Sequence, residues 1–124
     1  MFRFIVRPHR GPGNDAAAAR FATGFSQPLV AVPGRGAAPR ATPLLRVEPS
    51  DVIVTALKPS DDGKAWIVRL FGAGTEPASA TLTWSKPVPR RLWLSDTSER
   101  PIQKIIGAVT VPARGLVTIR AELP

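Results

Sequence analysis

Few side chains in this 124-residue sequence could do chemistry, since it has one histidine and no cysteine. The histidine, His9, lies between Pro8 and Arg10 at the end of a predicted strand. A zinc site needs three or four His, Cys or carboxylate ligands that converge, so we expect no metal or other cofactor in this chain. A Ser-His-Asp triad would normally come with a nucleophile-elbow motif, which the sequence lacks. His9 is therefore interpreted as a turn or interface residue rather than a catalytic one.

Two adjacent carboxylates, Asp61 and Asp62, are the next candidates for acid/base or calcium chemistry. They belong to the segment PSDDGK, where Asp typically hydrogen-bonds the local backbone and Gly63 tolerates a positive φ. Neighbouring residues also cannot flank a glycosidic bond in the way that the carboxylate pair of a glycosidase must. The pair therefore predicts a turn.

Tryptophan is the remaining candidate, because exposed aromatic rings can stack on sugars. Trp84 lies on the apolar side of its predicted strand, and Trp66 shares a side with Val68 and Leu70, so both are predicted to be core residues. Trp93 alternates with Arg91 and Ser95. It is the tryptophan that the pattern leaves open between core and surface.

Two charges interrupt the apolar stretch VIVTALKPSDDGKAWIVRLF at residues 52–71, which has the outline of a β-hairpin. Lys58 ends the first strand, and Arg69 alternates with Val68 and Leu70 in the second. The alternation places Arg69 on the side of the sheet away from the core. It is thus predicted to face water or another domain.

The formal charge of +8 permits an anionic partner. The basic residues are scattered, however, and no run is longer than Arg90-Arg91. Nucleic-acid binders usually show clustered Lys and Arg with aromatics placed for stacking, so we expect no nucleic-acid partner. The N-terminus lacks the continuous apolar region of a signal peptide, and no stretch approaches a membrane span. We therefore expect no membrane contact and, by default, a cytoplasmic location.

Three segments are predicted along the chain. Residues 1–32 combine a strand at residues 2–7 with a short helix over AAAARFA, which begins after Asn14 or Asp15 and ends at Gly24. Residues 33–43 are rich in proline and glycine and predict an extended connector. The main domain is residues 44–124.

Seven short strands are expected in the main domain, separated by turn sequences and without helical patterns between them: LLRV, VIVTAL, AWIVRLF, ASATLTW, RRLWLS, IIGAVTV and GLVTIRA. In ASATLTW the apolar Ala78, Ala80, Leu82 and Trp84 alternate with hydroxyl side chains, as in a sheet with one solvated face. The fold class is therefore all-β, an antiparallel β-sandwich of about seven short strands with a short N-terminal strand-helix segment.

Several stretches resemble family 38 glycoside hydrolases, the α-mannosidases. The segments FRFIVRPHRG and ARFATGFSQPLVAV are similar to the part of that family where a strand ending in Pro-His precedes a short helix and an Asn/Gln-Pro-Leu step. The hairpin at residues 52–71 and the closing strand GLVTIRAEL resemble the family's C-terminal β-sandwich. One departure is Phe71-Gly72, where family members commonly have an aromatic residue followed by Glu.

The resemblance implies a non-catalytic domain. The family's zinc and its Asp nucleophile belong to a catalytic domain that this sequence does not include, so the chain alone is expected to be inactive. It also implies a terminal fragment that begins inside a larger β region and has the catalytic portion as its partner. His9, Arg69 and Trp93 are the expected contacts with that portion or with a glycan. The alternative is a free-standing carbohydrate-binding or adhesion module that uses Trp93.

Overall fold

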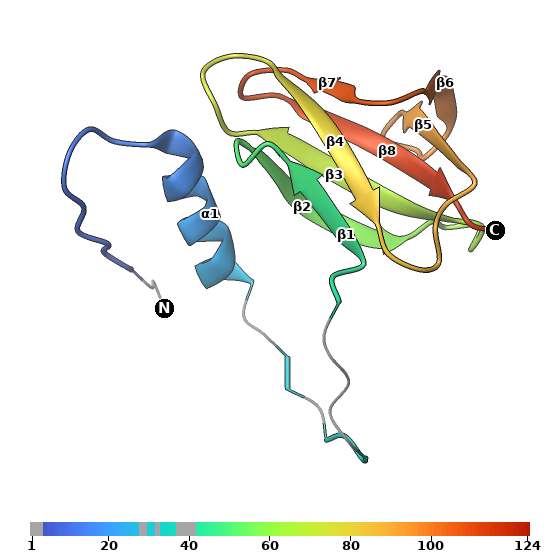
Figure 1. The fold of residues 1–124 in the computed structure, drawn as a ribbon, viewed down its shortest axis with the longest axis horizontal. Coiled ribbons are helices and arrows are strands. Elements are labelled where there is room, and N and C mark those ends of the chain that lie inside the picture. Colours follow the sequence, from blue (N-terminus) through green and yellow to red (C-terminus); the bar gives the residue numbers. More distant parts are fainter. Residues whose placement is uncertain (1–3, 28–29, 32, 37–41) are drawn as a thin grey trace.

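A computed structural model describes residues 4–27, 30–31, 33–36 and 42–124 of the chain. Within them lie one helix, α1 (Asp15–Ser26), and two antiparallel sheets (Figure 1). No helix in these ranges is long and apolar enough to cross a bilayer. The predicted all-β sandwich is confirmed.

The smaller sheet has three strands in the order β1-β4-β7, and the larger has five in the order β2-β3-β8-β5-β6. Their bounds are β1 (Leu45–Glu48), β2 (Val52–Pro59), β3 (Ala65–Gly72), β4 (Ala78–Trp84), β5 (Arg91–Ser95), β6 (Pro101–Ile105), β7 (Val109–Val111) and β8 (Leu116–Glu122). Every pairing within the two sheets is antiparallel.

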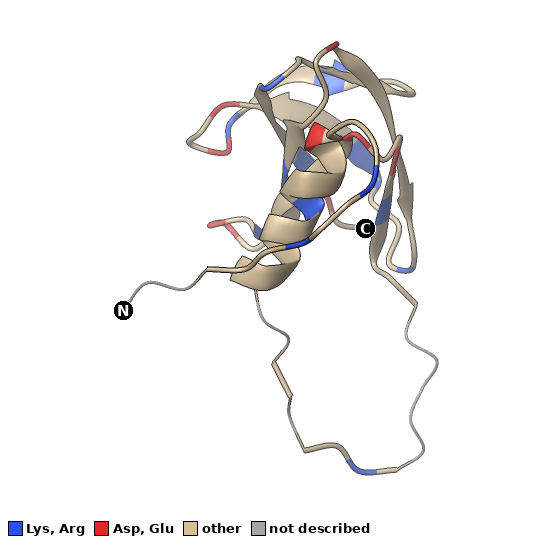
Figure 2. Ribbon diagram, turned by 90° about the vertical axis from the view of Figure 1, so that its left-hand side faces the viewer, with Lys and Arg blue, Asp and Glu red and all other residues tan. Residues whose placement is uncertain are grey.

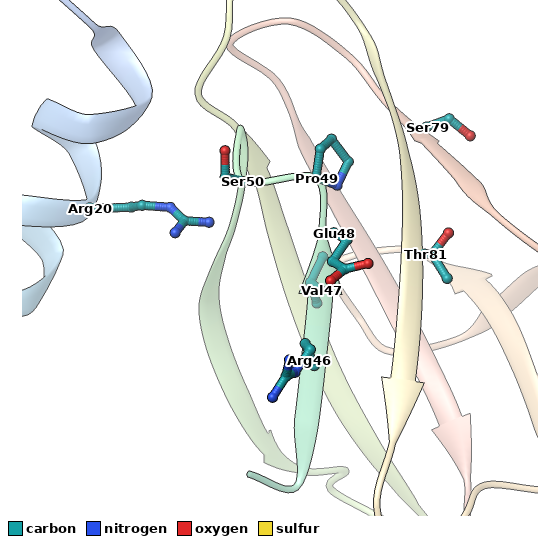
Figure 3. Close-up of a pocket in the computed structure, with 8 residues that line it drawn as sticks. All are labelled: Arg20, Arg46, Val47, Glu48, Pro49, Ser50, Ser79 and Thr81. Atoms are coloured by element: carbon teal, nitrogen blue, oxygen red, sulfur yellow. The ribbon is translucent and has the colours of Figure 1, made fainter.

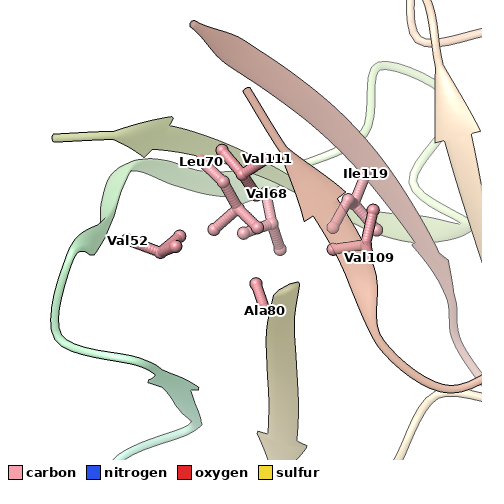
Figure 4. Close-up of a cluster of buried hydrophobic side chains, with 7 residues drawn as sticks. All are labelled: Val52, Val68, Leu70, Ala80, Val109, Val111 and Ile119. Atoms are coloured by element: carbon pink, nitrogen blue, oxygen red, sulfur yellow. The ribbon is translucent and has the colours of Figure 1, made fainter. Parts of the chain in front are cut away.

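The core lies between the two sheets and is built from small aliphatic side chains (Figure 4). Its buried members come from both layers: Val52, Val68, Leu70, Ala80, Val109, Val111 and Ile119. Trp84 packs against this cluster from the edge, as its alternation predicts, and Trp66 is half-buried. On the opposite side of β4, Ser79, Thr81 and Thr83 are exposed, so the smaller sheet has the solvated outer face that the sequence predicts.

Helix α1 lies beside the sandwich, on the side of β1 and β2 (Figure 1). It packs against Ile53 and Phe71 at one end of the outer face of the larger sheet. Ala16 of the helix is buried against Ile53 of β2, the register partner of Phe71. Asn14 caps the helix, because its Oδ1 accepts the Ala17 N–H at 2.8 Å. The Asn14 alternative of the predicted helix start is thus confirmed.

Three sequence predictions need correction. Residues 4–7 form no strand in the described part of the chain, where they are exposed and no neighbouring strand satisfies their backbone; residues 2 and 3 lie outside it. The helix continues past Gly24 to Ser26, because one glycine weakens a helix without ending it. The predicted strand at residues 105–111 is two strands, β6 and β7, with Gly107 at a φ of 78° between them.

Basic residues are spread over the helix, the strands and the loops (Figure 2). The expectation of scattered charge therefore holds for the fold as a whole. Local groups of charged side chains still arise where loops from different strands converge.

Candidate functional site

Two of the three predicted contact residues lie on one surface, the outer face of the larger sheet. Antiparallel partners point to the same face, so the pairings of Arg69 with Thr118 and of Thr118 with Ser95 place these three side chains in one row. The next row contains Arg120 and its partner Trp93. Arg69 and Trp93 are therefore two strands apart on the same face, opposite the core.

Trp93 is half-buried on this face rather than fully exposed. Its indole nitrogen and the hydroxyl of Ser95 are both buried and have no hydrogen-bond partner among the described residues. A ring in this position offers little flat surface for a sugar to stack on. The geometry therefore weakens the carbohydrate-binding alternative, which needs an accessible Trp93.

Arg69 is also half-buried, and its guanidinium forms no ion pair or hydrogen bond within the described residues. Its row lies between the row of Ile53 and Phe71, which α1 covers, and the row of Lys58 and Arg120. A guanidinium carries five N–H donors, so an unpaired one has capacity to bind a carboxylate or carbonyl of a partner.

The loop between β5 and β6 folds back over the other end of this face. Glu99, at a φ of 64°, accepts hydrogen bonds from the Lys58 ammonium and, at 2.9 Å, from the Asp61 N–H. Lys58 is on β2 and the loop leaves β5, three strands away, so the loop must cross β8 and β3. Ile67, the register partner of both Lys58 and Arg120 on this face, is only 1 % exposed.

The Glu99 contact was not predicted from the sequence. The segment SDTSERPIQ reads as a turn, and nothing in its pattern indicates a partner 41 residues away in the chain. Lys58, which ends the first predicted strand, is exposed. It forms ion pairs with Asp61 of the adjoining turn and with Glu99, and the Glu99 pair helps to hold the loop in place.

Asp62 hydrogen-bonds the local turn, as its sequence predicts, and it also forms an ion pair with Arg120 of β8. Its Oδ1 accepts the Ser60 hydroxyl at 2.7 Å and the Lys64 N–H at 3.0 Å, while its Oδ2 accepts Arg120 Nη2 at 2.6 Å. Gly63 follows with a φ of 69°. The ion pair explains how Arg120, on the outer face of the larger sheet, can be only 9 % exposed.

These contacts lower the pKa of Asp62 well below its ordinary value, chiefly through the Ser60 hydroxyl, then the Lys64 N–H and Arg120. A carboxyl whose pKa is lower in the folded state stabilises the fold above its unfolded pKa. That contribution is lost as the pH falls below about 3.8 toward the folded pKa. Asp62→Asn should therefore lose stability at pH 7 and respond less than the wild type to acidification from pH 5 to pH 3.

Urea unfolding midpoints at the three pH values test this expectation. Glu76→Gln is the matched control, because Glu76 is an exposed acid in the turn between β3 and β4. The control should lose as much stability as the wild type when the pH is lowered from 5 to 3. If Asp62→Asn lost as much stability as the wild type between pH 5 and pH 3, the Asp62 contacts would not stabilise the fold.

His9, the third predicted contact, lies on a different surface. It is exposed in the irregular segment before α1 and borders a groove of about 650 Å³ that also includes Arg7 and Phe21. The Arg7 guanidinium lies 5.4 Å from the centre of the Phe21 ring, a cation–π contact. His9 is therefore an exposed surface residue beside that groove.

A groove of about 680 Å³ lies between α1 and the smaller sheet (Figure 3). Arg20 reaches toward it from the helix, while Arg46 and Glu48 line it from β1 and Thr81 from β4. These four side chains are polar, and Glu48 balances part of the arginine charge. Val47 and Pro49 also line the groove, so its surface is mixed polar and apolar rather than mostly apolar as in a usual ligand pocket.

Strand β6 forms an exposed edge of the larger sheet. Ile102 is 70 % exposed and Ile106, just beyond the strand, is 85 % exposed. The pairing with β5 is irregular between Leu94 and Ser95, and Lys104 lies on the strand. A bulge and a lysine are devices that limit edge-to-edge aggregation, yet the two isoleucines remain available to a partner.

The described residues do not fit a zinc site. No group of three or more His, Cys, Asp or Glu side chains lies close enough to hold a metal ion within them.

Comparison with known proteins adds one finding. Residues 51–121 match the family model described as the C-terminal β-sandwich domain of family 38 glycosyl hydrolases. The match covers β2 to β7 and nearly all of β8, more than half of the chain. Searches of the curated proteins and of the solved structures give no significant match.

Proposed function

Because the chain belongs to the family 38 glycosyl hydrolase C-terminal β-sandwich domains, we propose that it is the non-catalytic sandwich of an α-mannosidase. In this role it binds the catalytic portion and supports hydrolysis of α-mannosides only in that assembly. Zinc would be held by the catalytic portion, and the chain alone would hydrolyse nothing.

The exposed β6 edge is the observation that carries the docking part of the proposal. A strand edge offers unpaired backbone groups, and Ile102 and Ile106 add apolar surface that a water-facing edge does not need. Arg69 supplies a polar anchor on the outer face of the same sheet. Apolar anchors and arginine are both typical of protein interfaces.

Binding to the family 38 catalytic region of the same organism tests the proposal. The wild-type chain should bind in solution, and the double variant Ile102→Asp/Ile106→Asp should bind at least about tenfold more weakly, because buried anchors commonly contribute more than 1 kcal/mol each. Isothermal titration calorimetry gives both affinities.

Val88→Asp is the matched control, since Val88 is 57 % exposed in the loop between β4 and β5. It adds the same kind of charge to an exposed aliphatic residue elsewhere and should leave the affinity unchanged. Equal weakening by the control and the double variant would contradict docking through β6. No binding by the wild-type chain would contradict the assembly itself.

A further inference from the structure

A second grouping of charges lies where one end of the larger sheet meets its loops. Lys64 ends the turn between β2 and β3, Arg90 directly precedes β5, Arg91 is the first residue of β5, and Arg120 lies near the end of β8. Together they line a pocket of about 540 Å³, in which Glu122 is the acidic member. We call these residues the basic pocket.

Backbone hydrogen bonds hold the three segments of the basic pocket together. The Arg90 N–H donates to the Glu122 carbonyl at 2.9 Å, and the Leu123 N–H donates to the Lys64 carbonyl at 3.0 Å. Arg91 is the register partner of Glu122. The cations are therefore mounted on paired strands and a tight turn, a scaffold that needs little ordering when a ligand binds.

The charges of the basic pocket are not balanced within it. Arg120 is neutralised by Asp62, its ion-pair partner at 2.6 Å. Lys64, Arg90 and Arg91 have no ion-pair partner among the described residues, and they face one carboxylate, that of Glu122. Three cations held together repel one another, and an anion bound among them would relieve that repulsion.

From these observations we propose that the basic pocket is a binding site for a small anionic ligand that bears a phosphate or carboxylate group. Arginine presents paired N–H donors that match the oxygens of both groups. A volume of about 540 Å³ lies within the range of small-molecule sites, so a phosphorylated monosaccharide fits by size. The site is independent of the docking edge β6 and of any catalytic partner.

Calorimetric titration of the chain at low ionic strength tests the site, with inorganic phosphate, succinate, glucose 6-phosphate and glucose as probes. We expect phosphate or succinate to bind, glucose 6-phosphate to bind at least as tightly as phosphate, and neutral glucose not to bind. Phosphate against succinate distinguishes the two anion classes. Binding should weaken with added salt, because exposed charges are screened.

Arg91→Gln and Arg90→Gln should each lower the affinity at least about tenfold, the loss expected for one charge-assisted contact. Arg46→Gln removes the same charge from the exposed face of the smaller sheet and should leave the affinity unchanged. Amide NMR shifts should map binding to Lys64, Arg90 and Arg91, and confirm that each variant is folded. Equal loss in all three variants, shifts confined to other residues, or no anion binding at millimolar concentration would each overturn the proposal.

Discussion

Replacing Gly72 with alanine should destabilise the domain by about 3 kcal/mol or more, the upper range for overpacking of a well-filled interior. A Cβ at this position would lie 2.2 Å from the Pro112 carbonyl oxygen and 3.3 Å from Val111 Cγ1. The Pro112 oxygen belongs to the backbone and cannot rotate away. Gly72 is itself fixed, since its N–H donates to Gly115 and its carbonyl accepts from Arg114.

Gly74→Ala is the control, because a Cβ there would have ordinary contacts no closer than 3.6 Å. Chemical denaturation should show a large loss for Gly72→Ala and a small change for the control. Similar small changes in both variants would show that the turn at residues 112–115 yields easily. The tight contact explains why position 72 is glycine in this chain, since a side chain would not fit beside Pro112.

Leu70→Ala should cost about 2 to 5 kcal/mol of the free energy of unfolding, the usual range for a buried leucine. Leu70 is 0 % exposed and belongs to the cluster that joins the two sheets (Figure 4). The chain has no cysteine, so no disulfide compensates for a cavity in this core. Urea denaturation followed by tryptophan fluorescence measures the loss.

Thr83→Ala is the comparison for Leu70→Ala, because Thr83 is exposed on the outer face of β4. It should change the stability by less than about 1 kcal/mol, as surface substitutions usually do. If Leu70→Ala were equally mild, the sandwich interior would not be the main source of stability.

The alternation of apolar and polar residues predicted most of the sandwich. Successive side chains of a strand point to opposite faces, so this alternation shows which face is buried. The prediction was wrong where proline and polar residues form a strand. In β6 the backbone pairs with β5 although Pro101, Gln103 and Lys104 carry no apolar pattern, since an edge strand buries little. The opposite error occurred near the N-terminus. Residues 4–7 alternate between apolar and polar as a strand would, but they form no strand, because no partner strand pairs with them.

Alternation also placed Arg69 on the side of the sheet away from the core, and the pairing confirms this. It left Trp93 open between core and surface, and the pairing with Arg120 puts the half-buried ring on that outer face. What covers that face was not predictable, because the cover comes from Glu99 and from α1, which are distant in the sequence. The ion pair of Arg120 with Asp62 and the basic pocket depend on the same convergence of loops. Local sequence thus predicts faces, while contacts between loops require the folded chain.

We propose that this sandwich acts only together with a family 38 catalytic region. The most direct measurement is the rate of 4-nitrophenyl α-mannoside hydrolysis by the organism's catalytic region, titrated with this chain in the presence of zinc. We predict no hydrolysis by the chain alone and a saturable rise in rate that follows the binding curve. Hydrolysis by the purified chain alone, or a rate unaffected by saturating chain, would contradict the account.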